Sequence, residues 1–299
     1  MSDTLDSLRR KLDGATQLGA VVRAMKALAA SSIGQYDAAL RALGDYQQAV
    51  EIGLRSCTPD ASTSRPRMQA SIGAIVFGSD QGLVGRFNEV IADFALGQLG
   101  TMPASKQIWG VGDRVCEQVA VNGSTPAQRY TLPGSVAGIS ALVERLLFDS
   151  EAKYSSGEFA SVFIFNNRPR SIALYAPVSL RLLPLDTAAA GPPQTLSRPT
   201  ARFREVLGSR EATYSLLVRE YLFICLYKAC AESLASENGS RLVAMQSAQQ
   251  NIEALSAATS QSYYRLRQSS IDADLFDVMT GFNSLVTPRG SRRTTSART

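Results

Sequence analysis

The chain contains no histidine and has few charged residues for its length. Its 299 residues are 19% charged and 45% hydrophobic, whereas an average soluble protein is about 25% charged. Without histidine, the chain itself cannot form a Ser-His-Asp triad, a Cys-His dyad or a histidine-ligated metal or haem site. Histidine is also the commonest general base at neutral pH, so its absence argues against an enzyme.

Long apolar runs are missing as well. No run reaches the roughly 18 residues needed to cross a bilayer, and charged residues from Asp3 to Lys11 interrupt any signal-peptide core. The four cysteines form no CxxC pair, so we expect buried thiols in a reducing compartment. We therefore expect a soluble intracellular protein that is at most peripheral to a membrane.

The net charge of +5 comes mainly from the C-terminal end. Residues 286–299 contain four arginines and no acidic residue, which leaves +1 for the rest of the chain. A nearly neutral body does not favour a nucleic-acid-binding protein. The basic tail has the composition of a disordered segment.

Proline is absent from both ends of the chain. All but one of the twelve prolines lie between Pro59 and Pro199, and the other is Pro288. Because proline breaks helix interiors, this distribution predicts a long N-terminal helix over residues 1–58 and a long C-terminal helix over 205–285. A central domain at 67–186, a linker at 187–204 and a tail at 286–299 complete the expected order.

Both proline-free segments show heptad-like spacing, which favours a coiled coil. The N-terminal positions are Leu5, Leu8, Leu12, Ala15, Leu18, Val22, Met25, Ala29, Ile33, Tyr36, Leu40 and Leu43. The C-terminal positions are Leu217, Tyr221, Ile224, Leu234, Leu242, Met245, Ala248, Ile252, Leu255, Thr259, Leu266, Ala273 and Phe276. A compact domain between the two segments predicts an antiparallel pair of helices.

The two predicted helices differ in length by about 40 Å at 1.5 Å per residue. We expect the C-terminal helix to extend beyond its partner and to expose Phe276, Met279, Phe282 and Leu285. Such an apolar segment is unfavourable in water, which predicts a surrounding sleeve supplied by another protein.

The central segment alternates between strand and helix patterns. Strands are predicted at 70–78, 106–111, 161–165, 172–176 and 180–185, and helices at 87–99, 113–119 and 139–148. The predicted fold class is therefore α/β: a long antiparallel two-helix coiled coil formed by the N- and C-terminal helices, plus a central Rossmann-like α/β domain. We expect no cofactor and no metal.

One turn in this domain has the position of a phosphate-binding loop. The sequence FGSDQGLVGRFN at 77–88 follows a strand and precedes a helix, but its glycines do not form GxGxxG and no Gly-Lys-Ser/Thr follows. A structural βα turn is therefore favoured. Two other classes of protein remain alternatives: a coiled-coil adaptor with an α/β recognition domain, and a small-molecule enzyme with its site in that domain.

Four segments, taken in order, resemble the γ subunit family of F-type ATP synthases. They are LRRKLDGATQLGAVVRAMKALAASS near the N-terminus, SDQGLVGRFN at 79–88, LLPL at 182–185 and the run from Glu237 to Leu285. In the last run, Glu237, Arg241, Ala244, Met245, Ala248, Asn251, Arg267, Gln268, Ile271 and Gly281 match the family pattern in register. Asp272, Gln81 and Val84 depart from it, which indicates a divergent bacterial lineage, with an alternative-operon type as one candidate.

The resemblance implies a central rotor shaft without a catalytic site of its own. It implies partners in the α and β subunits of a hexameric ring, in the ε subunit and in the membrane c-ring, with no nucleic acid and no transmembrane span. It also implies a peripheral location on the cytoplasmic side of a bacterial inner membrane. Rotation would couple ion flow through the c-ring to ATP synthesis or hydrolysis in the ring.

The resemblance further implies a set of partner-binding residues. Arg267 and Gln268 would contact loops of the β subunits, and Met25 and Lys26 would face their moving levers. Phe282 and Leu285 would form the bearing at the tip of the shaft. Arg241 and Asp272 are expected in the same rotor-stator set.

Overall fold

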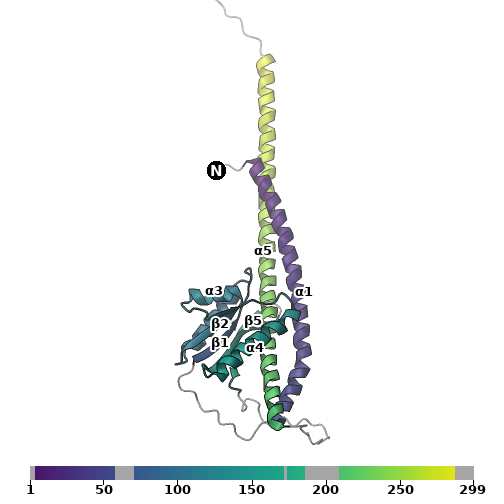
Figure 1. The fold of residues 1–299 in the computed structure, drawn as a ribbon. Helices are drawn as coiled ribbons and strands as arrows, with labels where there is room; N and C mark the ends of the chain where they lie inside the picture. Colours follow the sequence, from purple (N-terminus) through teal and green to yellow (C-terminus); the bar gives the residue numbers. More distant parts are fainter. Residues whose placement is uncertain (1–3, 58–70, 172–173, 186–208, 287–299) are drawn as a thin grey trace, which may run out of the picture. The chain divides into compact units, whose positions relative to one another are not determined.

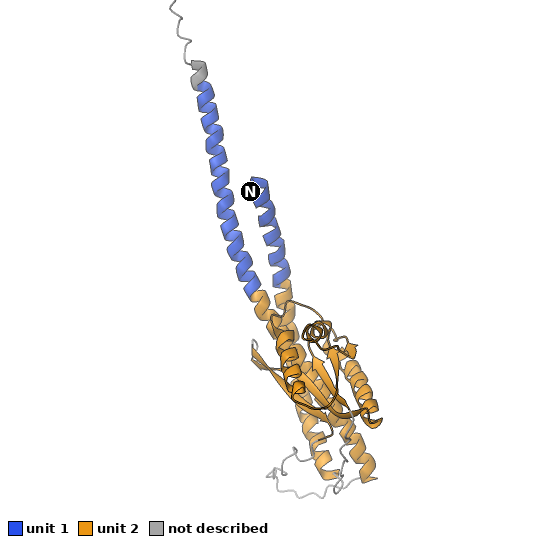
Figure 2. Cartoon of the chain, turned by 90° about the vertical axis from the view of Figure 1, so that its left-hand side faces the viewer, with its two compact units in different colours: residues 1–23, 247–299 blue, residues 24–246 orange. Residues whose placement is uncertain are grey.

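Two compact units make up the chain in the computed structural model, which describes residues 4–57, 71–171, 174–185 and 209–286. Unit 1 combines Met1–Arg23 with Ser247–Thr299, and unit 2 is Ala24–Gln246 (Figure 2). Two long helices, α1 (Leu5–Cys57) and α5 (Arg210–Val286), contribute residues to both units. The linker expected at 187–204 and the tail from residue 287 onward lie outside the described residues.

Unit 2 contains the α/β domain. Its strands are β1 (Ser71–Phe77), β2 (Lys106–Val111), β3 (Gln128–Tyr130), β4 (Phe159–Ser171) and β5 (Leu174–Leu183). Its helices are α2 (Phe87–Gly100), α3 (Asp113–Val121), the short 3₁₀ helix η1 (Val136–Gly138) and α4 (Ile139–Ser155). The predicted alternation of strands and helices is confirmed.

The sheet is mainly parallel and changes direction at β1. Its order is β3-β2-β1-β4-β5, where β1, β2, β3 and β4 pair in parallel and β5 pairs antiparallel to β4 (Figure 1). The chain runs outward from β1 to β3 and then returns to place β4 on the other side of β1. This order creates a topological switch point between β1 and β4, where open α/β folds usually bind ligands.

Side chains of β1 alternate between two hydrophobic cores. Ile72 and Val76 point to a core shared with α2 and α3, while Ile75 and Phe77 point to a core shared with α4 and α5. The second core also contains Tyr36 of α1. The sheet of unit 2 is therefore covered by two short helices on one face, and by α4 and the pair of long helices on the other.

Within unit 2, α1 and α5 run antiparallel in contact. The Arg210 guanidinium donates to the carbonyl oxygen of Ser56 at 3.0 Å, and Lys228 Nζ donates to Gln47 Oε1 at 3.3 Å. The buried α1 positions are seven or fourteen residues apart: Ala29, Tyr36, Val50 and Cys57. The predicted antiparallel pairing and heptad spacing are both confirmed here.

Within unit 1, the same two helices pair through small residues. Leu8, Ala15 and Val22 of α1 are buried at heptad spacing, and Gly19 is buried between them. On α5, Thr259 is buried and Ile252 is half-buried. Figure 2 shows the α5 part of this unit extending well past the α1 part, as predicted from the helix lengths.

Four details of the sequence-based prediction are wrong. Leu18 and Leu255 are 60% and 63% exposed, because the adjacent residues Gly19 and Ser256 occupy the inter-helix positions instead. The strands expected at 172–176 and 180–185 form the single strand β5, with residues 172–173 outside the described part. Strand β3 was not predicted at all; it has three residues, too few to show an alternating pattern.

Candidate functional site

One segment of α5 is buried on every side. Residues 229–239 are all buried, because the sheet packs on one face of the helix and α1 on another. The segment includes the carboxylates of Glu232 and Glu237. A buried charge is costly unless it is paired and hydrogen-bonded, so the partners of these two groups define how α5 is held.

Glu232 is bonded to the last part of β4. Its Oε2 accepts hydrogen bonds from Asn166 Nδ2 at 3.0 Å and from Arg168 Nε at 3.1 Å. The Glu232 side chain is 8% exposed, whereas that of Arg168 is 53% exposed. The carboxylate is thus enclosed in unit 2, while one of its two donors reaches the surface.

Glu237 is paired along the helix itself. Its Oε1 accepts a hydrogen bond from Arg241 Nη2 at 2.6 Å, and the two side chains are 8% and 11% exposed. Burial raises the pKa of the Glu237 carboxyl, and the charge and hydrogen bond of Arg241 oppose that rise. Burial is also the main reason that the pKa of the neighbouring Tyr36 hydroxyl is raised.

The turn between β1 and α2 is closed by its own side chains. Asn88 Oδ1 accepts from the Ser79 amide at 2.9 Å, and the Asp80 carboxylate accepts from the amides of Asp113 and Leu132 at 3.1 and 2.9 Å. A side chain at Gly78 would meet Val115 Cβ at 2.2 Å. These contacts support the structural reading of the turn over a phosphate-binding one.

The carboxyl ends of β1 and β4, where a ligand would bind at a switch point, are covered by α5. Ser236 Oγ donates to the carbonyl oxygen of Asn167 at 3.0 Å, and Ser240 Oγ donates to that of Val84 at 2.5 Å. The crevice typical of nucleotide-binding α/β domains is therefore filled by the chain's own helix. Among the described residues, no group of three or more potential ligand side chains could hold a metal ion.

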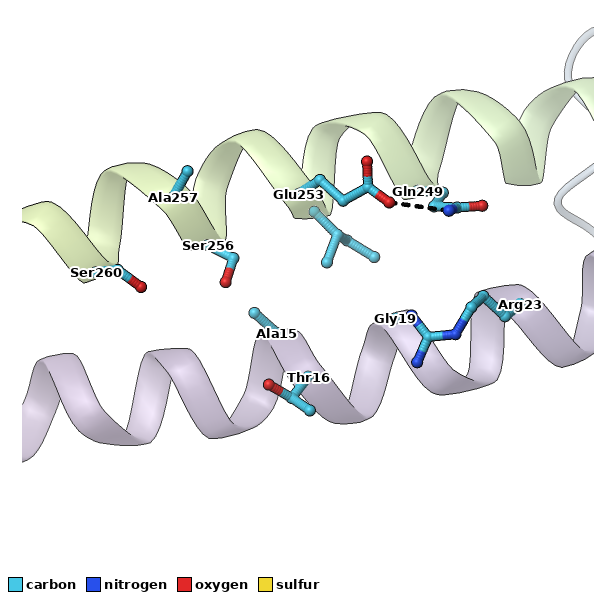
Figure 3. A pocket seen from close by; sticks show the side chains of 10 residues that line it. Ala15, Thr16, Gly19, Arg23, Gln249, Glu253, Ser256, Ala257 and Ser260 are labelled. Carbon is cyan, nitrogen blue, oxygen red and sulfur yellow. Dashed lines mark hydrogen bonds between the residues drawn. The ribbon is translucent and has the colours of Figure 1, made fainter.

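A shallow groove lies between the two helices of unit 1. It has a volume of about 410 Å³ and is lined mainly by small residues, among them Ala15, Gly19, Ser256 and Ser260 (Figure 3). In Figure 3 the Arg23 guanidinium lies near the groove, and Glu253 is bonded to Gln249 of the same helix. Small side chains leave space between the helices here.

Beyond the paired region of unit 1, α5 exposes many apolar side chains. Their exposed fractions range from 53% to 70%. They are Tyr264, Ile271, Leu275, Phe276, Val278, Met279 and Phe282. We call residues 267–286 the tip segment. Soluble monomeric proteins rarely expose contiguous apolar surface of this kind unless a partner covers it.

Comparisons with known proteins agree with these features. A family model described as ATP synthase matches residues 4–285. A protein named ATP synthase gamma chain from Anaeromyxobacter sp. (strain K) is 27% identical, with 94% of this chain and 99% of that protein covered. The gamma chain of Pelotomaculum thermopropionicum is 26% identical with the same coverage. The chain belongs to the ATP synthase gamma-chain family.

Solved structures show that the gamma-chain fold is shared. A chain of the Euglena gracilis mitochondrial ATP synthase (OSCP/F1/c-ring, rotational state 3) aligns with a TM-score of 0.65 at 15% identity, covering 98% of this chain and 99% of that one. A chain from the central stalk and c-ring of the Tetrahymena thermophila enzyme aligns with a TM-score of 0.55 at 19% identity, covering 76% and 99%. The α/β fold class with long terminal helices is confirmed.

The family assignment confirms the function that the resemblance implied, a central stalk subunit of an F-type ATP synthase. It takes the place of the alternative function, a coiled-coil adaptor. In the described part of this gamma chain, no helix is both long enough and apolar enough to span a bilayer.

The predicted partner-binding residues fall in different environments. In unit 1, Arg267, Gln268 and Asp272 are exposed on α5 and Phe282 is 65% exposed. Leu285 lies in α5, but its side chain is outside the described part.

The other three predicted residues lie in unit 2. Met25 and Lys26 are half-buried on α1. Arg241 is enclosed, and its guanidinium is bonded to Glu237 and Asn238 rather than presented at the surface. The predicted set is therefore divided between the two units, and one member, Arg241, is enclosed.

One residue of unit 2 has an unusual backbone conformation that the sequence did not predict. Leu83, at the centre of the β1–α2 turn, is 62% exposed and has a φ of +62°. A non-glycine residue with positive φ is uncommon and is strained unless its surroundings hold it. Leu83 stands between Gly82 and Gly85 in SDQGLVGRFN. An apolar side chain in such a turn was the available signal of an exposed leucine, but the segment was interpreted only as a structural turn.

Proposed function

We propose that this gamma chain is a non-catalytic rotor shaft that turns inside a ring of α and β subunits. The observation that carries the proposal is the tip segment, a helix of unit 1 with large apolar side chains exposed along one face. Full burial of one large apolar side chain contributes about 1.5–3 kcal/mol. An enclosing ring of partner subunits would supply that burial without requiring one fixed orientation of the helix.

The catalytic sites are assigned to the partner ring, not to this chain. Two features of the described residues support this: α5 fills the switch-point crevice, and the β1–α2 turn is closed by Asn88 and Asp80. The chain instead offers two long helices and a folded domain, which suit a mechanical part.

The partners are assigned by unit. The α and β subunits would surround unit 1, and the ε subunit and the membrane c-ring would bind the α/β domain of unit 2. The assembled protein would lie on the cytoplasmic side of a bacterial inner membrane, as a peripheral component. The bacterial sources of the matching gamma chains support this location.

The exposed polar residues of α5 indicate individual contacts with the β subunits. Arg267 and Gln268 would form polar contacts with β-subunit loops, because both are exposed on α5. Replacing Arg267 with Ala and Gln268 with Leu is expected to reduce ATP-driven ion pumping. Arg265, exposed two residues away, supplies the control variant Arg265→Ala. Equal pumping by the double variant and the wild type would remove these residues from the proposed contact set.

The proposal is tested by co-expressing the chain with the α and β subunits of the same genome. The complex would be isolated through a tag on this chain, and its composition and ATP hydrolysis measured. We expect three copies each of α and β with one copy of this chain, and hydrolysis of ATP. A chain that stays folded and soluble but forms no such complex would refute the rotor assignment.

A further inference from the structure

Three polar residues of α5 lie one helical turn apart and bond to the α/β domain. They are Glu232, Ser236 and Ser240, at positions i, i+4 and i+8, which places them on one face of the helix. We call these residues the polar ladder. All of its contacts lie inside unit 2.

Each residue of the ladder bonds to a different point of the domain. Glu232 accepts from Asn166 and Arg168 of β4, and Ser236 donates to the carbonyl oxygen of Asn167 at 3.0 Å. Ser240 donates to the carbonyl oxygen of Val84, in the β1–α2 turn, at 2.5 Å. The ladder therefore joins α5 to the carboxyl ends of both strands that flank the switch point.

Apolar side chains make a large part of the contact between α5 and the sheet. Leu222, Leu226, Ala229 and Leu234 belong to the hydrophobic core shared with the sheet. Apolar packing is strong but non-directional, so it opposes separation of the helix from the sheet more than it opposes sliding. A slip by one residue would turn the helix by about 100° and shift it by about 1.5 Å.

Hydrogen bonds are directional and resist such a slip. The rotation of about 100° that accompanies a one-residue slip would turn the three side chains of the ladder away from their partners at once. The buried carbonyl oxygens of Asn167 and Val84 would then lose these hydrogen bonds, as would the Glu232 carboxylate. Since an unpaired buried polar group is expensive, the ladder favours a single rotational register of α5.

We propose that the polar ladder transmits torque between the α/β domain and the shaft by fixing this register. The inference rests on the proposed rotor function, in which the c-ring turns the domain and α5 carries the rotation to the catalytic ring. Glu232, Ser236 and Ser240 are positioning residues in this account. They touch no substrate and act by keeping the helix from slipping against the domain that drives it.

The test measures ion pumping per ATP hydrolysed in the complete enzyme. Membranes carrying Ser236→Ala, Ser240→Ala or both are compared with wild type. We expect hydrolysis to continue while the ratio of pumping to hydrolysis falls at least about twofold in the double variant. That variant lacks two hydrogen bonds of the ladder, and losing even one net hydrogen bond changes an equilibrium roughly fivefold. Ser240→Thr keeps a hydroxyl at the same position and is expected to retain the wild-type ratio.

Ser215→Ala is the matched control. Ser215 lies on the same helix and also in unit 2, but its hydroxyl donates only to the carbonyl oxygen of Ala212, one turn away. A purely structural weakening of α5 would lower activity or heat stability in any of these variants without changing the ratio. A lower ratio in the ladder variants alone is therefore specific to the proposed role.

The remaining outcomes are also decisive. An unchanged ratio in the double variant would overturn the ladder proposal, and so would loss of assembly in both single variants, because the hydrogen bonds would then serve folding. If the wild-type chain itself neither assembles nor pumps, the rotor function fails instead. These two failures are distinguished by the wild-type sample.

Discussion

Glu237 and Arg241 pair one turn apart on α5, with 2.6 Å between Glu237 Oε1 and Arg241 Nη2, inside unit 2. The Glu-x-x-x-Arg spacing that resembled a family motif is thus used within the fold. Glu237 directly follows Ser236 in the sequence and Arg241 directly follows Ser240, so the pair lies beside the polar ladder. Its position makes Arg241 a structural residue of the buried segment in addition to any contact with partners.

Removing one member of this pair is expected to be severe. Arg241→Ala leaves the Glu237 carboxylate buried without its main partner, which costs about 3–5 kcal/mol. Replacing both residues with Met removes both charges and is expected to cost less than the single change. Chemical denaturation of the purified chain measures both effects. A small loss for Arg241→Ala would show that the pair contributes little to folding.

Substitutions in the tip segment are expected to affect assembly but not the stability of the isolated chain. Phe276 and Phe282 are 67% and 65% exposed, so replacing both with Ser should leave the stability of the isolated chain unchanged. The same change should weaken assembly with the α and β subunits, because these subunits would bury the two phenylalanine side chains. Phe148→Ser in unit 2 is the control, since Phe148 is 66% exposed. Normal assembly of the double variant would show that the ring does not enclose this segment.

The space around Gly19 predicts that an alanine at this position stabilises α1 in unit 1. A Cβ atom at Gly19 would lie 3.5 Å from Arg23 Nη1 and 3.8 Å from Ile252 Cγ2, which are ordinary contact distances. Gly19→Ala should therefore stabilise the helix by up to about 1 kcal/mol. Gly19→Leu should separate the two helices, whereas Leu18→Ala should have little effect because Leu18 is exposed. Circular dichroism melting distinguishes the three variants, and a larger loss for Leu18→Ala than for Gly19→Leu would contradict the pairing.

The four thiols are expected to be inert in the folded chain. Cys57, Cys116, Cys225 and Cys230 are all buried, and desolvation raises the pKa of Cys225 to about 11. Because the thiolate is the reactive form, maleimide labelling should be negligible at pH 8 and should increase as the pH approaches 11. Denaturant should expose all four at any pH. Rapid labelling of the native chain at pH 8 would contradict the burial.

Much of the fold could be predicted because helix spacing and proline distribution are properties of long segments. The phase of the coiled coil, that is, which residues face the partner helix, could not be predicted. Leu18 and Leu255 are the apolar choices at their positions, yet the adjacent residues Gly19 and Ser256 face the partner helix. A single helix does not show which of two adjacent residues its partner will meet.

The polar contacts of α5 were beyond sequence reasoning for a different reason. Glutamate and serine usually lie at a protein surface. Glu232, Ser236 and Glu237 are buried because the sheet and α1 both pack around the same segment of α5. The exposed residues of unit 1 were easier to place, since Arg267, Gln268 and Phe282 belong to a helix that extends beyond its partner. Their contacts with the ring remain a prediction.

The central claim is that this chain rotates, and a rotation measurement tests it most directly. Val121, at the end of α3, is 79% exposed, so Val121→Cys would give one reactive thiol for a visible probe while the native thiols stay buried. With the α and β ring fixed to a surface, ATP is predicted to drive rotation of the probe in one direction. A probe that stays still, or moves without direction, while the same complexes hydrolyse ATP would contradict the rotor account.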